Sequence, residues 1–255
     1  MAALYEVHGV TKAFGEHRVL DGLDLVVNKG EFLTIVGESG AGKSLLVKLM
    51  LGLMSTDGGS IVFDGVDVTN LKERDWVAVR KRVGVLLQSS GLFDSMNVLD
   101  NVAYGLREQR VLDESAIRKR VAESLAMVAL PGIEAMWPQD LSGGMRKRVA
   151  LARAIAMRPE VLFYDGPTEG LDPINVGRVN RLLAGLRRQL GITTIVITHQ
   201  METVFGVADR VLFLADGHIA IEGAPGALWE SGDPRLAPFL HIARAVMKQP
   251  RQSIG

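Results

Sequence analysis

Eight consecutive residues near the start of the chain carry its strongest chemical signal. They read GESGAGKS, from Gly37 to Ser44. In a loop of this pattern, backbone N–H groups can surround phosphate oxygens, a lysine can reach the β- and γ-phosphates, and a hydroxyl can ligate magnesium. The pattern therefore predicts a nucleoside triphosphate site formed by Gly37, Glu38, Ser39, Gly40, Ala41, Gly42, Lys43, Ser44 and the following Leu45.

A second string with paired glycines, LSGGM, spans Leu141 to Met145. A helix that begins after a serine cap presents free backbone N–H groups, and these groups can bind an anion. Taken alone, the string is more typical of an ordinary N-cap in front of a solvated basic helix. Because it accompanies the phosphate loop, we expect a second phosphate contact from Ser142, Gly143, Gly144 and Met145.

The elements around these strings alternate between strands and helices. Phe32 to Val36 reads as a buried strand, and apolar residues from Leu45 to Leu53 recur at helical spacing, so the phosphate loop would join a strand to a helix N-terminus. From about residue 98 to 156 helical spacing replaces the strand pattern. Further strands are expected at 4–10, 23–27, 60–63, 83–88, 161–165 and 193–199, followed by a hairpin around Gly217 and a helix over 235–247.

Composition excludes several classes of function. The 29 basic and 29 acidic residues cancel, so the chain has no overall field that would attract nucleic acid. The absence of cysteine excludes disulfides, thiolate catalysis and cysteine-ligated metals, and it fits a reducing cytosol. The first residues lack a signal-peptide pattern, and no apolar run approaches the roughly 18 to 20 residues that span a bilayer. We expect a soluble chain whose membrane role, if any, comes through a partner.

The order of the motifs resembles that of the ATP-binding subunits of ATP-binding cassette (ABC) transporters, over about residues 4 to 230. LSGGMRKRVALARA resembles the signature loop and helix of that family, and VLFYDGP resembles its Walker B strand. The resemblance implies an α/β fold of the P-loop NTPase class, with a RecA-like core, an antiparallel β subdomain and a helical signature subdomain. It places the core and β subdomain at 1–88 and 157–230, the helical subdomain at 89–156, and a C-terminal helix and tail at 231–255.

The same resemblance assigns roles to single residues around bound ATP and Mg²⁺. In the family, the signature loop of one subunit closes over the γ-phosphate held by the phosphate loop of another. Phe14 matches a ring that stacks on adenine, although a core role is nearly as compatible with the sequence. The loop containing Asp172 matches one that crosses the dimer interface. The implied catalytic residues are Gln88, Asp165 and His199, and the implied metal ligands are Ser44, Gln88 and Asp165.

One position departs from the family pattern. The family places a glutamate after the Walker B aspartate, where it polarises the attacking water, but this chain has Gly166. Losing such a base typically costs about 10² to 10⁴ in rate. Glu169 lies only three residues further on, but it belongs to the following loop and is expected to point elsewhere. Three explanations stay open: a slow or regulatory ATPase, a variant that traps the ATP-bound dimer, or a sequence error.

The segment from Gln88 to Val98 is where the family docks a membrane permease. Leu92, Phe93 and Met96 offer apolar side chains for a permease helix, or else they pack inside the helical subdomain. Met145 in the signature string, together with GDPRLAPFL near the C-terminus, resembles the ATPases of Mla/Mce phospholipid transporters. This resemblance implies a homodimer that closes on ATP and, through hydrolysis, powers lipid transport. It also implies integral-membrane permease subunits, possible accessory regulatory and lipid-binding subunits, and a cytoplasmic position on the inner membrane.

Parts of the sequence are compatible with other functions. Basic clusters at Arg80 to Arg82 and Arg146 to Arg148 raise a nucleic-acid role, but the chain has one cassette and no coiled-coil insertion, so no nucleic acid is expected. A non-catalytic or slow nucleotide sensor, or a transporter ATPase for another substrate, remains as an alternative. The C-terminal stripe of Leu236, Phe239, Leu240, Ala243 and Met247 is expected to pack on its own domain.

Overall fold

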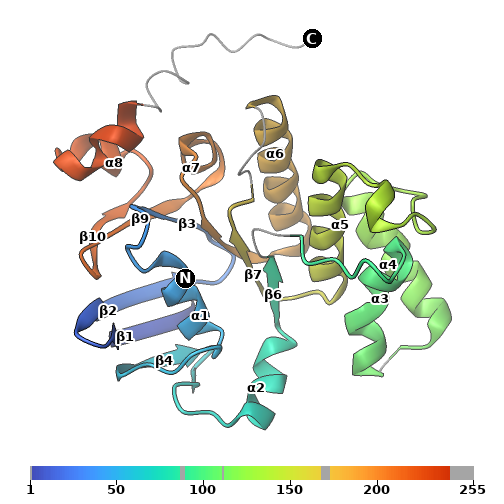
Figure 1. Cartoon of the computed structure of the whole chain (residues 1–255), viewed down its shortest axis with the longest axis horizontal. Coiled ribbons are helices and arrows are strands. Elements are labelled where there is room, and N and C mark those ends of the chain that lie inside the picture. Colours follow the sequence, from blue (N-terminus) through green and yellow to red (C-terminus); the bar gives the residue numbers. More distant parts are fainter. Residues whose placement is uncertain (1, 87–89, 111, 168–172, 242–255) are drawn as a thin grey trace.

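A six-stranded sheet forms the centre of the fold (Figure 1). The computed structural model describes residues 2–86, 90–110, 112–167 and 173–241. The sheet order is β10-β9-β3-β8-β7-β6, and every neighbouring pair is parallel except the β9–β10 hairpin. Its strands are β3 (Phe32–Gly37), β6 (Val83–Leu86), β7 (Val161–Asp165), β8 (Thr193–Ile197), β9 (Arg210–Ala215) and β10 (His218–Gly223).

The central strands β3, β8 and β7 are buried along almost their whole length because both faces of the sheet are covered there. On β3, Leu33 and Ile35 join one buried cluster, whereas Phe32 and Val36 join clusters on the opposite face. Both faces of β3 are therefore buried, so its sequence is a nearly continuous apolar run and does not alternate between apolar and polar residues. The helices on that opposite face include α6 (Pro173–Leu190) and α7 (Met201–Val207), with α8 (Ala227–Glu230) and the 3₁₀ turn η2 (Pro234–Leu236) near the β9–β10 hairpin.

A second, antiparallel sheet covers the other face through helix α1 (Lys43–Met50). Alternate residues of its long strands point inward, as Leu23, Leu25 and Val27 do. They share one buried cluster with the apolar face of α1, which therefore lies between the two sheets. The sheet order is β2-β1-β4-β5, from β1 (Ala3–Phe14), β2 (His17–Asn28), β4 (Gly58–Phe63) and β5 (Val66–Asp67).

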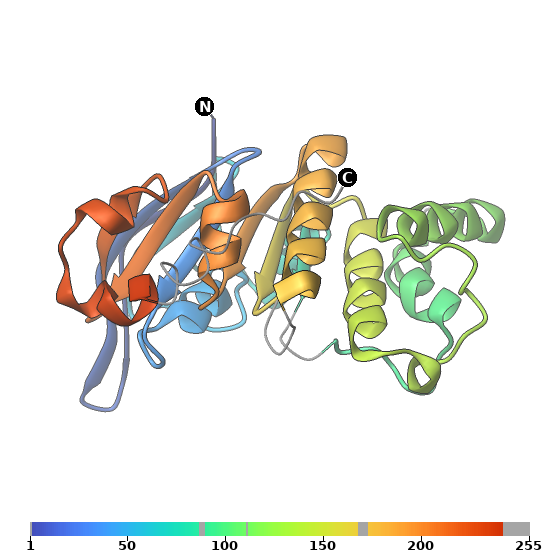
Figure 2. The ribbon, with the colours of Figure 1, turned by 90° about the horizontal axis from the view of Figure 1, so that it is seen from above.

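A helical region forms the third part of the molecule. It contains α3 (Val98–Gln109), α4 (Glu114–Met127) and α5 (Gly143–Ala156), with a 3₁₀ turn η1 (Pro138–Asp140) before α5. Each of the three helices begins after a polar cap, Asn97, Asp113 or Ser142, whose side chain accepts a hydrogen bond from a first-turn N–H group. Figure 2 shows this region at the opposite end of the molecule from the β1–β2 hairpin.

The predicted α/β order, with an antiparallel β region and a helical region, is confirmed. One expectation was wrong in extent, and one helix was missed. The first two strands are longer than 4–10 and 23–27, because they continue into an exposed hairpin tip at residues 15–18. Helix α2 (Glu73–Arg80) was not expected, because only its Trp76 is buried and the segment has no apolar stripe.

Several expectations fall partly outside the described residues. The end of the expected strand over 83–88 and residues 242–247 of the expected helix over 235–247 lie there, whereas residues 237–241 are described and are helical. The domain boundaries at 88, 156 and 230 stay predictions. Among the described residues, no helix combines the length and apolarity that crossing a membrane requires.

Candidate nucleotide-binding site

The glycine-rich loop joins β3 to α1, as the sequence predicts. Gly37 ends the strand with a φ of +151°, and a Cβ at this position would lie 2.3 Å from the carbonyl oxygen of Leu214. No side chain fits there, because the backbone of β9 passes too close. Glycine at this position lets the chain pass β9 and enter the loop before α1. The exposed backbone N–H groups at the N-terminus of α1 favour an anion.

Lys43 is fixed at the centre of this loop. Its side chain is only 6% exposed, and its ammonium donates to the carbonyl oxygens of Gly37 at 2.9 Å and Glu38 at 2.6 Å. A buried ammonium needs such acceptors. The loop thus holds a positive charge beside the first turn of α1, where phosphate oxygens would bind.

Ser44 and Asp165 bring a hydroxyl and a carboxylate together beside the loop. The Ser44 hydroxyl donates to Oδ2 of Asp165 at 3.0 Å. The contact arises because β3, β8 and β7 are parallel neighbours whose register puts Asp165 level with Ile197, and Ile197 level with Ile35. Hydroxyl and carboxylate oxygens are ligands that Mg²⁺ prefers. Gln88, the third expected metal ligand, lies outside the described residues.

An open cavity of about 560 Å³ lies over these groups. His199, two residues beyond the end of β8, lines it together with Lys43, Ser44 and Asp165. Phe14, at the end of β1, also lines it and is 52% exposed. That exposure excludes the core role that the sequence left open for Phe14 and leaves its ring available for stacking. Val19, Lys48 and Met54 line the same cavity and were not expected from the sequence.

Gly166 follows Asp165 directly and has a φ of +62°. Its N–H donates to the carbonyl oxygen of Ile197 at 2.9 Å, which ties this backbone geometry to β8. A residue with a Cβ costs about 1 to 2 kcal/mol in the left-handed region. The backbone after Asp165 is therefore suited to glycine. Among the described lining residues of the cavity, Asp165 is the one carboxylate, and Glu169 lies outside the described residues.

The LSGGM string forms the N-terminus of α5. Ser142 caps the helix, and its hydroxyl accepts from the N–H of Met145 at 3.2 Å. Gly144 has open space around the position of a Cβ, with no heavy atom within 4 Å. Ser142 is thus an N-cap, but the second half of α5 is buried rather than solvated, and the first turn carries an uncovered glycine that an anion could approach.

This second loop does not reach the first cavity. Ser142 and Gly144 line a separate cavity of about 710 Å³, whose described lining includes no residue of the glycine-rich loop. The wall of the second cavity is basic. Burial, and then the charge of Arg178, lower the pKa of Arg148, so an anion bound there would relieve the repulsion between the two guanidinium groups. The basic side chains of the lining are Lys147, Arg148, Arg178 and Arg181.

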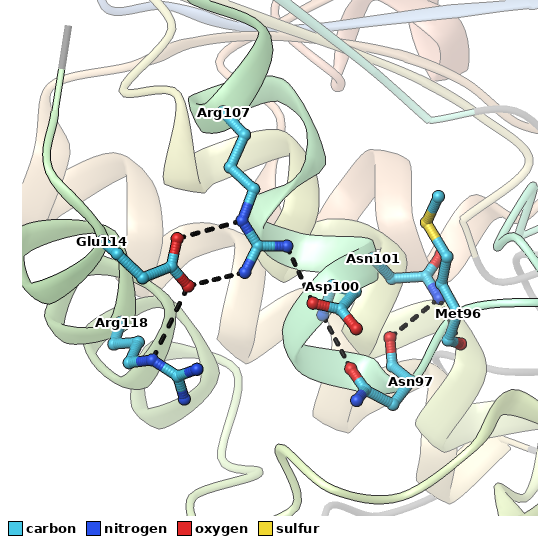
Figure 3. A network of polar contacts seen from close by, with 7 residues as sticks. All are labelled: Met96, Asn97, Asp100, Asn101, Arg107, Glu114 and Arg118. Atoms are coloured by element: carbon cyan, nitrogen blue, oxygen red, sulfur yellow. Dashed lines mark hydrogen bonds and ion pairs between the residues drawn. The ribbon is translucent and has the colours of Figure 1, made fainter. Parts of the chain in front are cut away.

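A buried asparagine that the sequence analysis missed organises the segment before α3 (Figure 3). The Asn101 side chain is fully buried; its Oδ1 accepts from the N–H of Phe93 at 2.8 Å. Its Nδ2 donates to the carbonyl oxygens of Phe93 at 3.0 Å, Met96 at 2.9 Å and Asn97 at 3.0 Å. An asparagine inside an apolar helical stretch is the signal that could have found it, because a buried amide requires partners.

An aromatic pair is exposed on this segment. Phe93 and Tyr104 are each 41% exposed, and their ring centroids lie 5.0 Å apart. The Arg153 guanidinium lies 5.6 Å from the Phe93 ring and donates to the carbonyl oxygen of Gly91 at 2.8 Å. Leu92 instead packs against the helical core, so the alternative of internal packing is correct for Leu92 and not for Phe93.

Further along the same region, Arg107 links α3 to α4. It donates to Oδ1 of Asp100 at 2.7 Å and to Oε1 of Glu114 at 2.7 Å (Figure 3). Glu114 also lies 3.6 Å from Arg118, one turn along α4. With Asn101, these ion pairs make α3, its preceding segment and the start of α4 one connected polar network.

The chain is similar in sequence and in fold to known ATP-binding proteins. A family model described as "ABC transporter" matches residues 20–169. The Haemophilus influenzae protein named "Intermembrane phospholipid transport system ATP-binding protein MlaF" is 41% identical over 237 residues, which cover 93% of this chain and 90% of that protein. The Mycobacterium bovis "Probable ribonucleotide transport ATP-binding protein mkl" is 37% identical over 244 residues, covering 96% of this chain and 68% of that protein. The dimeric ATP-binding cassette MJ0796, bound to ADP and Pi, has a TM-score of 0.79 at 29% identity, covering 87% of this chain and 99% of that one.

Proposed function

The chain belongs to the ABC transporter family, and we propose that it is the ATP-binding subunit of a transporter that moves phospholipid between bacterial membranes. The family and the P-loop NTPase fold class predicted from the sequence are confirmed. The phospholipid assignment rests on the similarity to MlaF, which extends over nearly the full length of both chains. A relative named for ribonucleotide transport supports the alternative of another substrate.

The main support for an ATP site is that Lys43, Ser44 and Asp165 line the same cavity. Lys43 would bind the β- and γ-phosphates, and Phe14 would stack on the adenine. Ser44 and Asp165 offer the oxygen donors that fit Mg²⁺, with Gln88 as the further expected ligand. When bound, the ion neutralises charge on the phosphate oxygens.

His199, two residues beyond the end of β8, lines the same cavity and would contact the γ-phosphate there. With Gly166 in place of the usual glutamate, no general base is supplied at that position. We expect the chain to hydrolyse ATP slowly, because such a base contributes about 10² to 10⁴ in rate. ATP binding is expected to be intact, since Lys43, Ser44 and Asp165 do not depend on a glutamate there.

A homodimer would complete the site. The phosphate loop and the signature loop line separate cavities of one chain, so they do not face the same nucleotide. A second copy could present Ser142 and Gly144 to the γ-phosphate held by the first. The basic residues behind the signature loop would favour that approach electrostatically. Closure on ATP and reopening after hydrolysis would then move whatever is attached to the two copies.

The permease would dock on the exposed Phe93 and Tyr104 pair. Aromatic side chains on an otherwise polar surface are typical anchors of protein interfaces. Asn101 holds the docking segment to α3, so that movement of the helical region would be transmitted as a rigid unit. Membrane association would come through this permease, with the chain on the cytoplasmic face of the inner membrane and accessory subunits joining the complex.

The test uses the transporter complex isolated through this chain from detergent-solubilised membranes. Its rate of ATP hydrolysis is measured with added phospholipid or with added ribonucleotide. The rate of a Lys43→Ala complex is subtracted as background, which gives the Lys43-dependent rate. We expect phospholipid to raise the Lys43-dependent rate and ribonucleotide to leave it unchanged. Stimulation by ribonucleotide alone would favour the other substrate, and a complex that binds ATP without any Lys43-dependent turnover would favour the nucleotide sensor.

A further inference from the structure

The C-terminal segment touches the candidate nucleotide site through one aromatic contact. The ring of Phe239 stacks on the ring of His199, with centroids 6.4 Å apart and planes 16° from parallel. Phe239 also contacts Phe213 of β9, edge-on, with the ring centroids 5.8 Å apart. Phe239 therefore contacts both a fully buried ring of the sheet and a histidine that lines the nucleotide cavity.

The segment that carries Phe239 is anchored by specific contacts. Leu236 is fully buried in the cluster that contains Phe213. The Arg235 guanidinium is paired with both Asp233 and Asp216, and it lies 5.9 Å from the Phe213 ring. The Asp233 carboxylate also accepts from the N–H of Arg235 at 2.9 Å. These contacts fix the start of the helical residues 237–241 and so fix the place of Phe239.

The His199 side chain has little else to orient it. It is exposed, and no described side chain forms a hydrogen bond with its ring. The χ2 torsion of histidine has broad energy wells, so the ring plane depends on its neighbours. A hydrogen bond to one ring nitrogen usually sets that plane in a functional histidine. Here the near-parallel contact with the Phe239 ring is the feature that restricts the plane of the His199 ring.

We propose that Phe239 is a positioning residue that holds the His199 ring in the plane needed to contact the γ-phosphate. The inference rests on the proposed role of His199 in ATP hydrolysis. It makes the segment from Asp233 to His241 part of the ATPase machinery. A movement of this segment would change the hydrolysis rate without touching the nucleotide.

The test replaces Phe239 in the complete transporter complex. Phe239→Leu keeps an apolar side chain but removes the ring, and Phe239→Tyr keeps the ring. An aromatic pair of this kind supports about a two- to ten-fold effect on a rate. We expect Phe239→Leu to lower kcat by about that factor with KM for ATP unchanged, and Phe239→Tyr to restore kcat. Phe205→Leu is the matched control, because it removes a ring from the same cluster, one that contacts Trp229.

A double-mutant cycle with His199→Ala separates this inference from the proposed function. If Phe239 acts through His199, Phe239→Leu has no further effect on kcat in the His199→Ala background. The inference is overturned if Phe239→Leu lowers kcat equally in the His199 and the His199→Ala backgrounds. It is also overturned if Phe239→Leu leaves kcat unchanged although His199→Ala lowers kcat. In both cases the proposed function stands. If His199→Ala leaves kcat unchanged, the proposed role of His199 fails and the role of Phe239 fails with it.

Discussion

The Ser44 hydroxyl and the Asp165 carboxylate are 3.0 Å apart in the fold and 121 residues apart in the sequence. Ser44 belongs to the first turn of α1, and Asp165 ends β7. The sheet brings them together because the carboxyl ends of parallel strands meet at one edge, where ligands of α/β proteins usually bind. The Mg²⁺ site that we propose rests on this pair.

Ser44→Ala and Asp165→Asn should therefore weaken nucleotide binding only when magnesium is present. Each change removes an oxygen donor, and the loss of affinity for Mg²⁺–ATP is expected to be about ten- to a hundred-fold. Titration with a fluorescent ATP analogue, with Mg²⁺ and then with excess chelator, measures the difference. An equal loss in chelator would show that the pair supports the loop rather than the metal.

Gly166→Glu should raise ATP turnover by about two or more orders of magnitude, because it supplies the missing base. It should also lower the free energy of unfolding by about 1 to 2 kcal/mol, because φ is +62° at this position. Gly166→Ala is the matched control: it carries the same strain and no carboxylate. Steady-state hydrolysis and thermal unfolding are measured for both. If the unchanged chain already turns over as fast as Gly166→Glu, another group activates the water and the account of Gly166 is wrong.

Gly37→Ala should disrupt the phosphate loop, because its Cβ would meet the Leu214 backbone at 2.3 Å. Such a clash with a strand cannot be relieved by a side-chain rotation, so a loss of about 3 kcal/mol or more in unfolding free energy is expected. Gly144→Ala is the comparison, since it enters open space and gains helix propensity. Chemical denaturation distinguishes the two; equal stability of both variants would contradict the loop geometry.

Phe93→Asp should prevent assembly with the permease and leave ATP affinity unchanged, because it places a charge on the exposed aromatic pair without touching the nucleotide cavity. Asn101→Ala should act differently. It removes the side-chain partners of the Phe93 N–H and of the Met96 carbonyl oxygen, so we expect a loss of about 2 to 3 kcal/mol in stability as well. Co-purification and thermal unfolding measure both effects. Normal assembly of the Phe93→Asp chain would move the docking surface elsewhere.

Short motifs predicted the local structure around the candidate site, because that structure depends on neighbouring residues. The turn at Gly37, the helix after Lys43 and the cap at Ser142 depend on neighbouring residues, and the strand ending at Asp165 is a plain apolar run. Contacts between distant segments gave no such signal. Phe239 meets His199 only because residues 233–241 fold back over β9, which no local pattern encodes.

Three further features were missed because hydrophobic periodicity and short motifs do not indicate them. Asn101 is polar inside an apolar helix, and its partners are backbone groups that carry no sequence signal. Helix α2 buries only Trp76, so hydrophobic periodicity does not detect it. The exposure of Phe14 could not be known before the end of β1 was placed beside the nucleotide cavity.

Mixing two defective chains tests the shared ATP site most directly. Lys43→Ala removes the phosphate-loop charge; Gly144→Asp puts a carboxylate on the signature loop, where the open space accepts it and the helix N-terminus favours it. Each variant alone should lack ATP turnover above background. Their mixed dimer contains one intact site, formed by the loop of one chain and the signature of the other, so turnover should return on mixing. A mixture as inactive as its components, or full turnover by Gly144→Asp alone, would contradict a site shared between two copies.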